Sequence, residues 1–180
     1  MALLNLYNAV ATVSIALTSV IANSGDIKIS ECNKLIDSIN ELDPVVVEFE
    51  SKNNQLSQGF KNAKDLDEIQ VLAAESAREF HTFASNLDSI TQEIKLINLT
   101  DKQLTSFQNR YAQTGKDLSQ GIHDMAQVLT NLTQVEATQE GLEQLNTIES
   151  DIDTIGKKLD SVSEASDKVV DQINSYCGAK

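Results

Sequence analysis

Two histidines are the residues of this chain whose side chains could most readily hold a metal or transfer a proton. Neither His81 nor His123 has a Cys or Glu at metal-ligand spacing, and neither follows a Glu by three residues, as in a ferritin-like di-metal site. The sequence also contains no Cys-x-x-Cys-His haem motif, no phosphate-binding glycine loop and no nucleophile elbow. We therefore predict no metal, no cofactor and no enzymatic activity, with each histidine at the surface or at its boundary.

The two cysteines, Cys32 and Cys177, allow two interpretations. A disulfide between them would span 145 residues of sequence and would stabilise the fold by ~4 to 5 kcal/mol in the chain-entropy model. Such bonds persist in oxidising compartments, so this pairing would indicate export. The alternative is two unrelated thiols, one buried in a helix seam and one in a frayed tail. The choice depends on the elements that carry the two residues.

Composition and hydrophobic periodicity predict an all-α fold. The chain has one Pro, seven Gly and an aromatic share of 4%, which favours helices over a sandwich or a barrel. Apolar residues recur in alternating steps of three and four along four segments, at about 30–59, 64–97, 101–132 and 142–176. Because only short turns separate them, we predict an up-down-up-down four-helix bundle with heptad seams over residues 26–177, followed by a tail at 178–180.

Two helix boundaries carry local signals. Asp43-Pro44 predicts a kink or a short break inside the first helix, with Asp43 capping the restart. Thr100 and Gln103 have the spacing of a capping box, which predicts Thr100 as the N-cap of the third helix.

The predicted topology bears on the cysteines. In an up-down-up-down bundle the start of the first helix and the end of the fourth helix are neighbours at one end. Cys32 and Cys177 occupy those two places, so the topology favours the disulfide over two unrelated thiols.

The third predicted helix has a weak point at mid-length. Gly115 and Gly121 each cost ~1 kcal/mol against Ala inside a helix, and Thr114 takes a seam position. One interpretation is a place where two helices touch closely. The other is a hinge or a small pocket that could take a ligand.

Residues 1–23 form a mostly apolar segment that carries no charge. A signal peptide fits its length and the small residue Ala22, although no Lys or Arg stands near the start. A membrane anchor needs ~20 apolar residues, a length that the segment reaches although polar residues dilute it. The third interpretation is an amphipathic or buried helix of the bundle. We assign the segment as an N-terminal hydrophobic helix in front of the bundle, either signal peptide or membrane anchor.

Charge limits the range of partners. The chain carries 27 Asp and Glu against 14 Lys and Arg, a formal net charge of -13. Because phosphate backbones would be repelled on average, we predict no nucleic-acid partner, while a cationic partner stays open. Contact with a membrane is expected only through residues 2–22. Short turns favour a monomer, and a dimer of helical hairpins is the alternative.

Three short stretches also resemble a group of uncharacterised, exported, mostly helical proteins of cyanobacteria, in which a hydrophobic leader precedes a helical domain bounded by cysteines. The stretches are Glu31-Cys32-Asn33-Lys34-Leu35, Leu99-Thr100-Asp101-Lys102-Gln103-Leu104 with Phe107-Gln108-Asn109-Arg110-Tyr111, and Ile173-Asn174-Ser175-Tyr176-Cys177. The similarity covers residues 30–177, and this chain differs in its uncharged leader. The resemblance implies a periplasmic or membrane-tethered domain, supports the cysteine pairing, and implies no known activity.

These observations lead to one functional expectation and two alternatives. The expected function is a non-enzymatic module, structural or for interaction, that is periplasmic or extracellular and is either free or membrane-anchored. The first alternative is a membrane-active bundle of the pore-forming type, whose N-terminal helix inserts into bilayers. The second is a small-ligand sensor or carrier with its pocket near Gly115 and Gly121.

Overall fold

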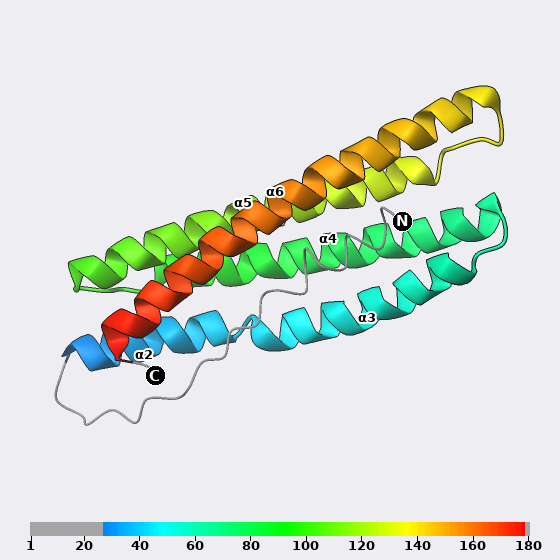
Figure 1. Cartoon of the computed structure of the whole chain (residues 1–180). Coiled ribbons are helices and arrows are strands. Elements are labelled where there is room, and N and C mark those ends of the chain that lie inside the picture. Colours follow the sequence, from blue (N-terminus) through cyan, green and yellow to red (C-terminus); the bar gives the residue numbers. More distant parts are fainter. Residues whose placement is uncertain (1–26, 179–180) are drawn as a thin grey trace.

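The heptad segments fold into five helices in the computed structural model, which describes residues 27–178 (Figure 1). The helices are α2 (Ile27–Asn40), α3 (Asp43–Asn62), α4 (Leu66–Leu96), α5 (Lys102–Leu132) and α6 (Gln139–Cys177). No strand occurs within residues 27–178, so the all-α prediction is confirmed there. The predicted hydrophobic helix at 1–23 and residues 179–180 of the predicted tail lie outside the described residues.

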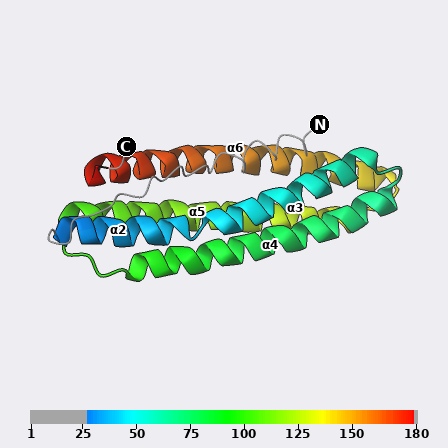
Figure 2. The same cartoon turned by 90° about the horizontal axis from the view of Figure 1, so that it is seen from below.

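The helices form four antiparallel arms, because α2 and α3 follow one another as a single bent arm (Figures 1 and 2). The α3–α4 and α5–α6 turns lie at one end of the molecule, and the α4–α5 turn lies at the other end. At that second end, α2 lies beside the C-terminal end of α6. The first and last arms are therefore neighbours at this end, as the predicted topology required.

The helices share their contacts unevenly. Helix α5 packs along both α4 and α6, whereas α3 packs mainly on α4. The short helix α2 contacts α4, α5 and α6 together. Consequently the first arm contacts α4 through both of its helices, and it contacts α5 and α6 mainly through α2.

The bend between α2 and α3 lies where Asp43-Pro44 predicted it. The backbone turns at Glu41 and Leu42, and the N–H of Val46 donates to the Leu42 carbonyl oxygen at 2.9 Å. The N-cap is Leu42, whose side chain makes no capping hydrogen bond, so the prediction that Asp43 caps the restart is wrong. The break is only two residues long and Leu42 is buried in the core, which leaves Asp43 as the first residue of α3.

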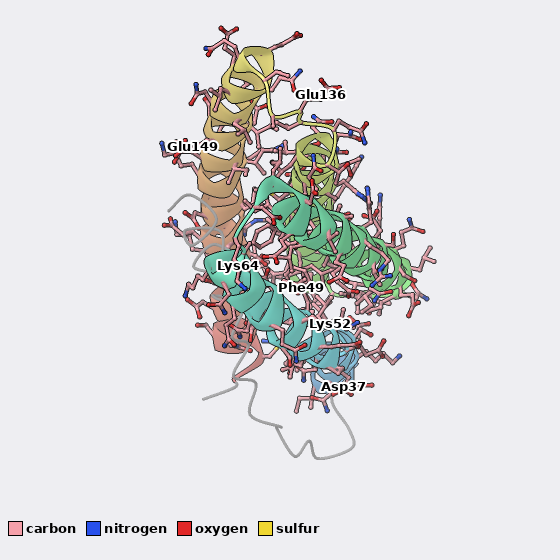
Figure 3. All side chains as sticks on the ribbon, turned by 90° about the vertical axis from the view of Figure 1, so that its right-hand side faces the viewer. Asp37, Phe49, Lys52, Lys64, Glu136 and Glu149 are labelled. Carbon is pink, nitrogen blue, oxygen red and sulfur yellow. A yellow bond between two sulfur atoms is a disulfide. The ribbon has the colours of Figure 1, made fainter. Side chains whose placement is uncertain are left out.

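Aromatic rings from α3 and α4 fill the interior near the bend. Phe49 stacks on Phe83 with ring centroids 4.2 Å apart and meets Phe80 edge-on at 5.0 Å. In the end-on view, Phe49 lies among the helices while a charged side chain such as Glu149 extends outward from α6 (Figure 3). This is the burial that the heptad pattern requires. Within residues 27–178, none of the helices combines the length and apolarity needed to cross a bilayer.

Candidate functional site

The disulfide lies at the end of the bundle where α2 meets α6. Cys32 and Cys177 are joined by an S–S bond of 2.07 Å, with their Cα atoms 5.8 Å apart, so the predicted pairing is present in the structure. The Cys32 side chain is buried, and Cys177 is the last residue of α6. Gly178 follows with a positive φ of 76°, a left-handed conformation that glycine adopts without strain and that ends the helix. The bond therefore ties the first arm to the last.

Next to the disulfide, Glu31 is buried with its carboxylate fully engaged. Its Oε1 accepts hydrogen bonds from the Thr100 N–H at 2.8 Å and from the Thr100 hydroxyl at 2.6 Å, and its Oε2 accepts from the Asp101 N–H at 2.9 Å. Only 5% of the residue is exposed. These bonds, first of all that of the Thr100 hydroxyl, lower the pKa of Glu31. A carboxylate from α2 thus holds the loop that leads into α5.

The engagement of Thr100 changes how α5 begins. Asp101, and not Thr100, is the N-cap, and its Oδ1 accepts from the N–H groups of Gln103 at 2.8 Å and Leu104 at 2.9 Å. The prediction of a Thr100 cap is therefore wrong, because the Thr100 hydroxyl donates to Glu31 instead. A threonine hydroxyl in this loop could either cap α5 or donate a hydrogen bond to another group. The buried Glu31 carboxylate from α2 decides between these two roles.

Tyr176 completes the contacts between the loop and the end of α6. Its hydroxyl donates to Asp101 Oδ2 at 2.9 Å, and its ring meets Phe107 edge-on with centroids 5.7 Å apart. The Lys28 ammonium nitrogen lies 3.7 Å from the Tyr176 ring centroid, which is the geometry of a cation–π contact. We call Glu31, Thr100, Asp101 and Tyr176, together with the disulfide, the disulfide-end cluster. It brings together the three stretches on which the resemblance was based.

The protonation equilibria of this cluster suit a structural role. The pKa of Asp101 is lowered, mainly by the hydrogen bond from the Leu104 N–H, which makes the carboxylate a poor general base. The pKa of Tyr176 is raised, mainly by its hydrogen bond to Asp101, which makes the phenol a poor nucleophile. A hollow of about 610 Å³ beside Tyr176 is lined by Gln103, Phe107, Arg110, Asp171, Gln172, Ser175 and Tyr176. The two shifts favour an ionised Asp101 and a protonated Tyr176, the states in which the phenol donates to the carboxylate.

The Glu31 contacts predict a pH-dependent contribution to stability. Because the folded-state pKa of Glu31 lies below the unfolded-state value, protonation favours the unfolded chain. The contribution is complete above about pH 5 and is lost as the pH falls through about 4.5 and below. Glu31→Gln should remove the Glu31 part of this dependence, while the part from Asp101, whose pKa is also lowered, remains. The variant should also have a Tm lower by roughly 5 °C at pH 7, because an amide nitrogen would face the Asp101 N–H. Thermal unfolding of both proteins from pH 3 to pH 7 measures it.

Asp43 and Asp167 contribute to stability with the opposite pH dependence, because their pKa values are raised. Burial is the main cause of both shifts. Both are present in the wild type and in the Glu31→Gln variant, so their effect cancels in the difference. Glu93→Gln, on the exposed side of α4, is the matched control and should leave Tm almost unchanged. An equal pH dependence in wild type and Glu31→Gln would contradict the assignment.

The predicted hinge or pocket residues lie in the middle of α5. A Cβ atom at Gly115 would approach the Thr91 Oγ1 to 2.5 Å, and a Cβ atom at Gly121 would approach the Leu159 Cδ2 to 2.6 Å. Thr114 is half-buried, and its hydroxyl donates to the Tyr111 carbonyl oxygen. Close contact with α4 and α6 thus accounts for both glycines. A hinge or ligand pocket at these residues stays a prediction.

The histidines are surface residues as predicted, but the structure brings them into contact with one another. His81 on α4 is exposed and His123 on α5 is partly exposed, and their Nδ1 atoms are 3.1 Å apart. Sequence spacing gave no signal for this, because the residues are 42 positions apart on different helices. The Glu31 contact was missed too, although Glu31 stands one helical turn before the buried Leu35 and so on a face expected to be covered.

No protein-family model, curated protein or solved structure matches this chain. The resemblance to exported helical proteins therefore stays a prediction.

Proposed function

We propose that this protein is a non-enzymatic helical bundle, exported or membrane-tethered, that acts as a structural or interaction module at the cell envelope. The observation that carries the proposal is the Cys32–Cys177 disulfide, which closes the bundle end where the first and last arms meet. Disulfides form and persist in oxidising compartments and are rare where thiols are kept reduced. A hydrophobic segment at 1–23, as signal peptide or membrane anchor, would deliver the bundle to such a compartment.

The polar contacts of the bundle end support a module without catalysis. Hydrogen bonds of the titratable groups at this end join α2, the α4–α5 loop and α6. These groups are Glu31, Asp101 and Tyr176. Their pKa shifts make the carboxylates weaker bases and the phenol a weaker nucleophile. Such groups stabilise one arrangement of the arms, and they would keep an outer surface in a fixed shape.

The acidic surface indicates the kind of partner that an interaction module of this type would bind. Helix α6 alone carries nine acidic and three basic side chains. Its ion pairs, such as Lys157 Nζ to Asp153 Oδ2 at 2.6 Å, engage only part of that acid excess. Complementary charge speeds association and selects partners, so a partner with a basic surface fits best.

The experiment that tests the proposal is the intact mass of the protein isolated from its native host without reductant. The sample is alkylated directly, and a second sample is alkylated after reduction. We expect no alkylation before reduction and two labelled thiols after it, with a mass that lacks the leader if residues 1–22 are a signal peptide. A full-length mass with both thiols free would contradict the proposal and would favour the membrane-active alternative.

A further inference from the structure

His81 and His123 form a side-chain pair across the outer edge of the α4–α5 interface. The two Nδ1 atoms are 3.1 Å apart, and the ring centroids are 5.4 Å apart with the planes inclined by 46°. The helices are antiparallel and in close contact along this line, since the Ser119 hydroxyl of α5 donates to the Ala84 carbonyl oxygen of α4 at 3.2 Å. The helix register that brings Ser119 next to Ala84 therefore also places His81 opposite His123.

The distance between the two nitrogens is close to that of two ligands on one metal ion. Imidazole nitrogens bind zinc at about 2.0 to 2.1 Å, and a tetrahedral angle then separates them by about 3.3 Å. At the observed 3.1 Å one ring can donate a hydrogen bond to the other, and a metal would replace that proton once the rings turn so that both Nδ1 lone pairs meet at one point. Both backbones are held in long helices, so the site is largely formed before a metal binds.

A carboxylate stands behind one of the two rings. Asp88 Oδ2 lies 3.8 Å from His123 Nε2, the nitrogen on the far side of the ring from Nδ1. At 3.8 Å the two atoms are too far apart for a hydrogen bond, and a modest movement of either side chain would be needed to form the carboxylate–histidine hydrogen bond found in many metal sites. Once formed, that bond would place a proton on Nε2 and leave Nδ1 free to bind a metal. Asp88 also lies two helical turns after His81 on α4, so both partners of His123 come from one face of one helix.

We propose that His81 and His123 form a two-histidine site for a divalent transition metal, with Asp88 positioning the His123 ring. Imidazole ligands suit Cu²⁺, Zn²⁺ and Ni²⁺, and the general order of stability makes Cu²⁺ the tightest of the three. Within residues 27–178 there is no group of three or more His, Cys, Asp or Glu side chains that could hold a metal. Water would complete the coordination, and the site would be open and exchangeable.

Solvent reaches the pair mainly from the His81 side, because His81 is exposed whereas His123 is only partly exposed. His81 lines a shallow hollow of about 600 Å³ with small and hydroxyl-bearing residues from α4 and α5, including Ala77, Ser85 and Thr130. Arg78 lines the same hollow, and its guanidinium lies 3.5 Å from the Glu79 carboxylate. A metal held by the two histidines would thus have this hollow beside its His81 ligand, with room there for water or for a small ligand. This departs from the sequence prediction of no metal.

Titration of the full, disulfide-bonded chain with Cu²⁺ tests the proposal, in a non-coordinating buffer that contains excess Mg²⁺ to occupy carboxylates. We expect one tight Cu²⁺ per chain by calorimetry and nitrogen hyperfine splitting from two imidazoles by electron paramagnetic resonance. His81→Ala and His123→Ala should each weaken binding at least about tenfold, and Asp88→Asn up to about tenfold. Both histidines lie at the surface, so the variants should keep the helical circular dichroism of the wild type.

The matched control is Asp124→Asn, which removes a carboxylate next to His123 in sequence that pairs with Lys158 at 3.2 Å instead of with a histidine. It should leave Cu²⁺ affinity unchanged. Equal affinity in wild type and either histidine variant, an imidazole signal from only one ring, or the absence of tight binding would each overturn the proposal.

Discussion

Removal of the Cys32–Cys177 disulfide should lower the free energy of unfolding by about 4 to 5 kcal/mol, the largest single effect that we expect in this chain. The bond joins residues 145 positions apart, so its loss releases nearly the whole bundle from a closed loop in the unfolded state. Replacement of both residues by Ala avoids a hydroxyl at the buried Cys32. Urea unfolding of the oxidised wild type and of the double variant measures the difference.

Reductant supplies the internal control for that experiment. It should lower the midpoint of the wild type to near that of the double variant, and it should leave the double variant unchanged. The hydrogen bonds of Glu31, Asp101 and Tyr176 persist in both proteins, so α2 should still pack on α6 at low denaturant. A difference below about 1 kcal/mol would mean that the unfolded chain is already compact without the disulfide, so that the bond removes little of its conformational entropy.

Gly141→Ala should destabilise the protein by about 3 kcal/mol or more, because the new methyl group would meet backbone and not a flexible side chain. Gly141 lies in the first turn of α6, where its N–H donates to the hydroxyl of the N-cap Thr138 at 3.1 Å. The chain before this turn folds back so closely that a Cβ atom would overlap the Glu136 carbonyl oxygen. The turn or the start of the helix must therefore shift. Thermal and urea unfolding measure the loss.

The same helix offers the matched control. A Cβ atom at Gly156 would meet nothing within 4 Å, so Gly156→Ala should only restore helix propensity and stabilise the protein by about 1 kcal/mol. Opposite signs for two identical substitutions in one helix would separate close packing from propensity. Stabilisation by Gly141→Ala would show that the turn adopts another conformation in solution.

Local patterns in the sequence were sufficient for the helices. The three-four recurrence of apolar residues depends only on neighbours along one helix, and it placed α4, α5 and α6 within a few residues of their observed ends. The bend of the first arm was predicted from Pro44, which lacks a backbone N–H and crowds the preceding turn. The cysteine pairing followed as well, because the order and direction of four arms bring Cys32 and Cys177 to one end whatever the details of packing.

Local patterns failed where two residues could perform the same task. Thr100 and Asp101 are both good N-caps, and the sequence predicted Thr100. The buried carboxylate of Glu31, which is 69 positions away from Thr100, takes up the Thr100 hydroxyl and leaves the cap to Asp101. No property of the loop itself contains this information.

The sequence by itself determined the all-α class, the approximate ends of the helices and the end of the bundle at which the cysteines meet. The tertiary structure decided the register between helices, and with it the Glu31, Tyr176 and His81–His123 contacts. The physical reason is that a heptad pattern fixes which face of a helix is buried but leaves its axial position against a neighbour undetermined. If one helix slid along its neighbour by one turn, every apolar seam would stay buried, but His81 and His123 would no longer be in contact.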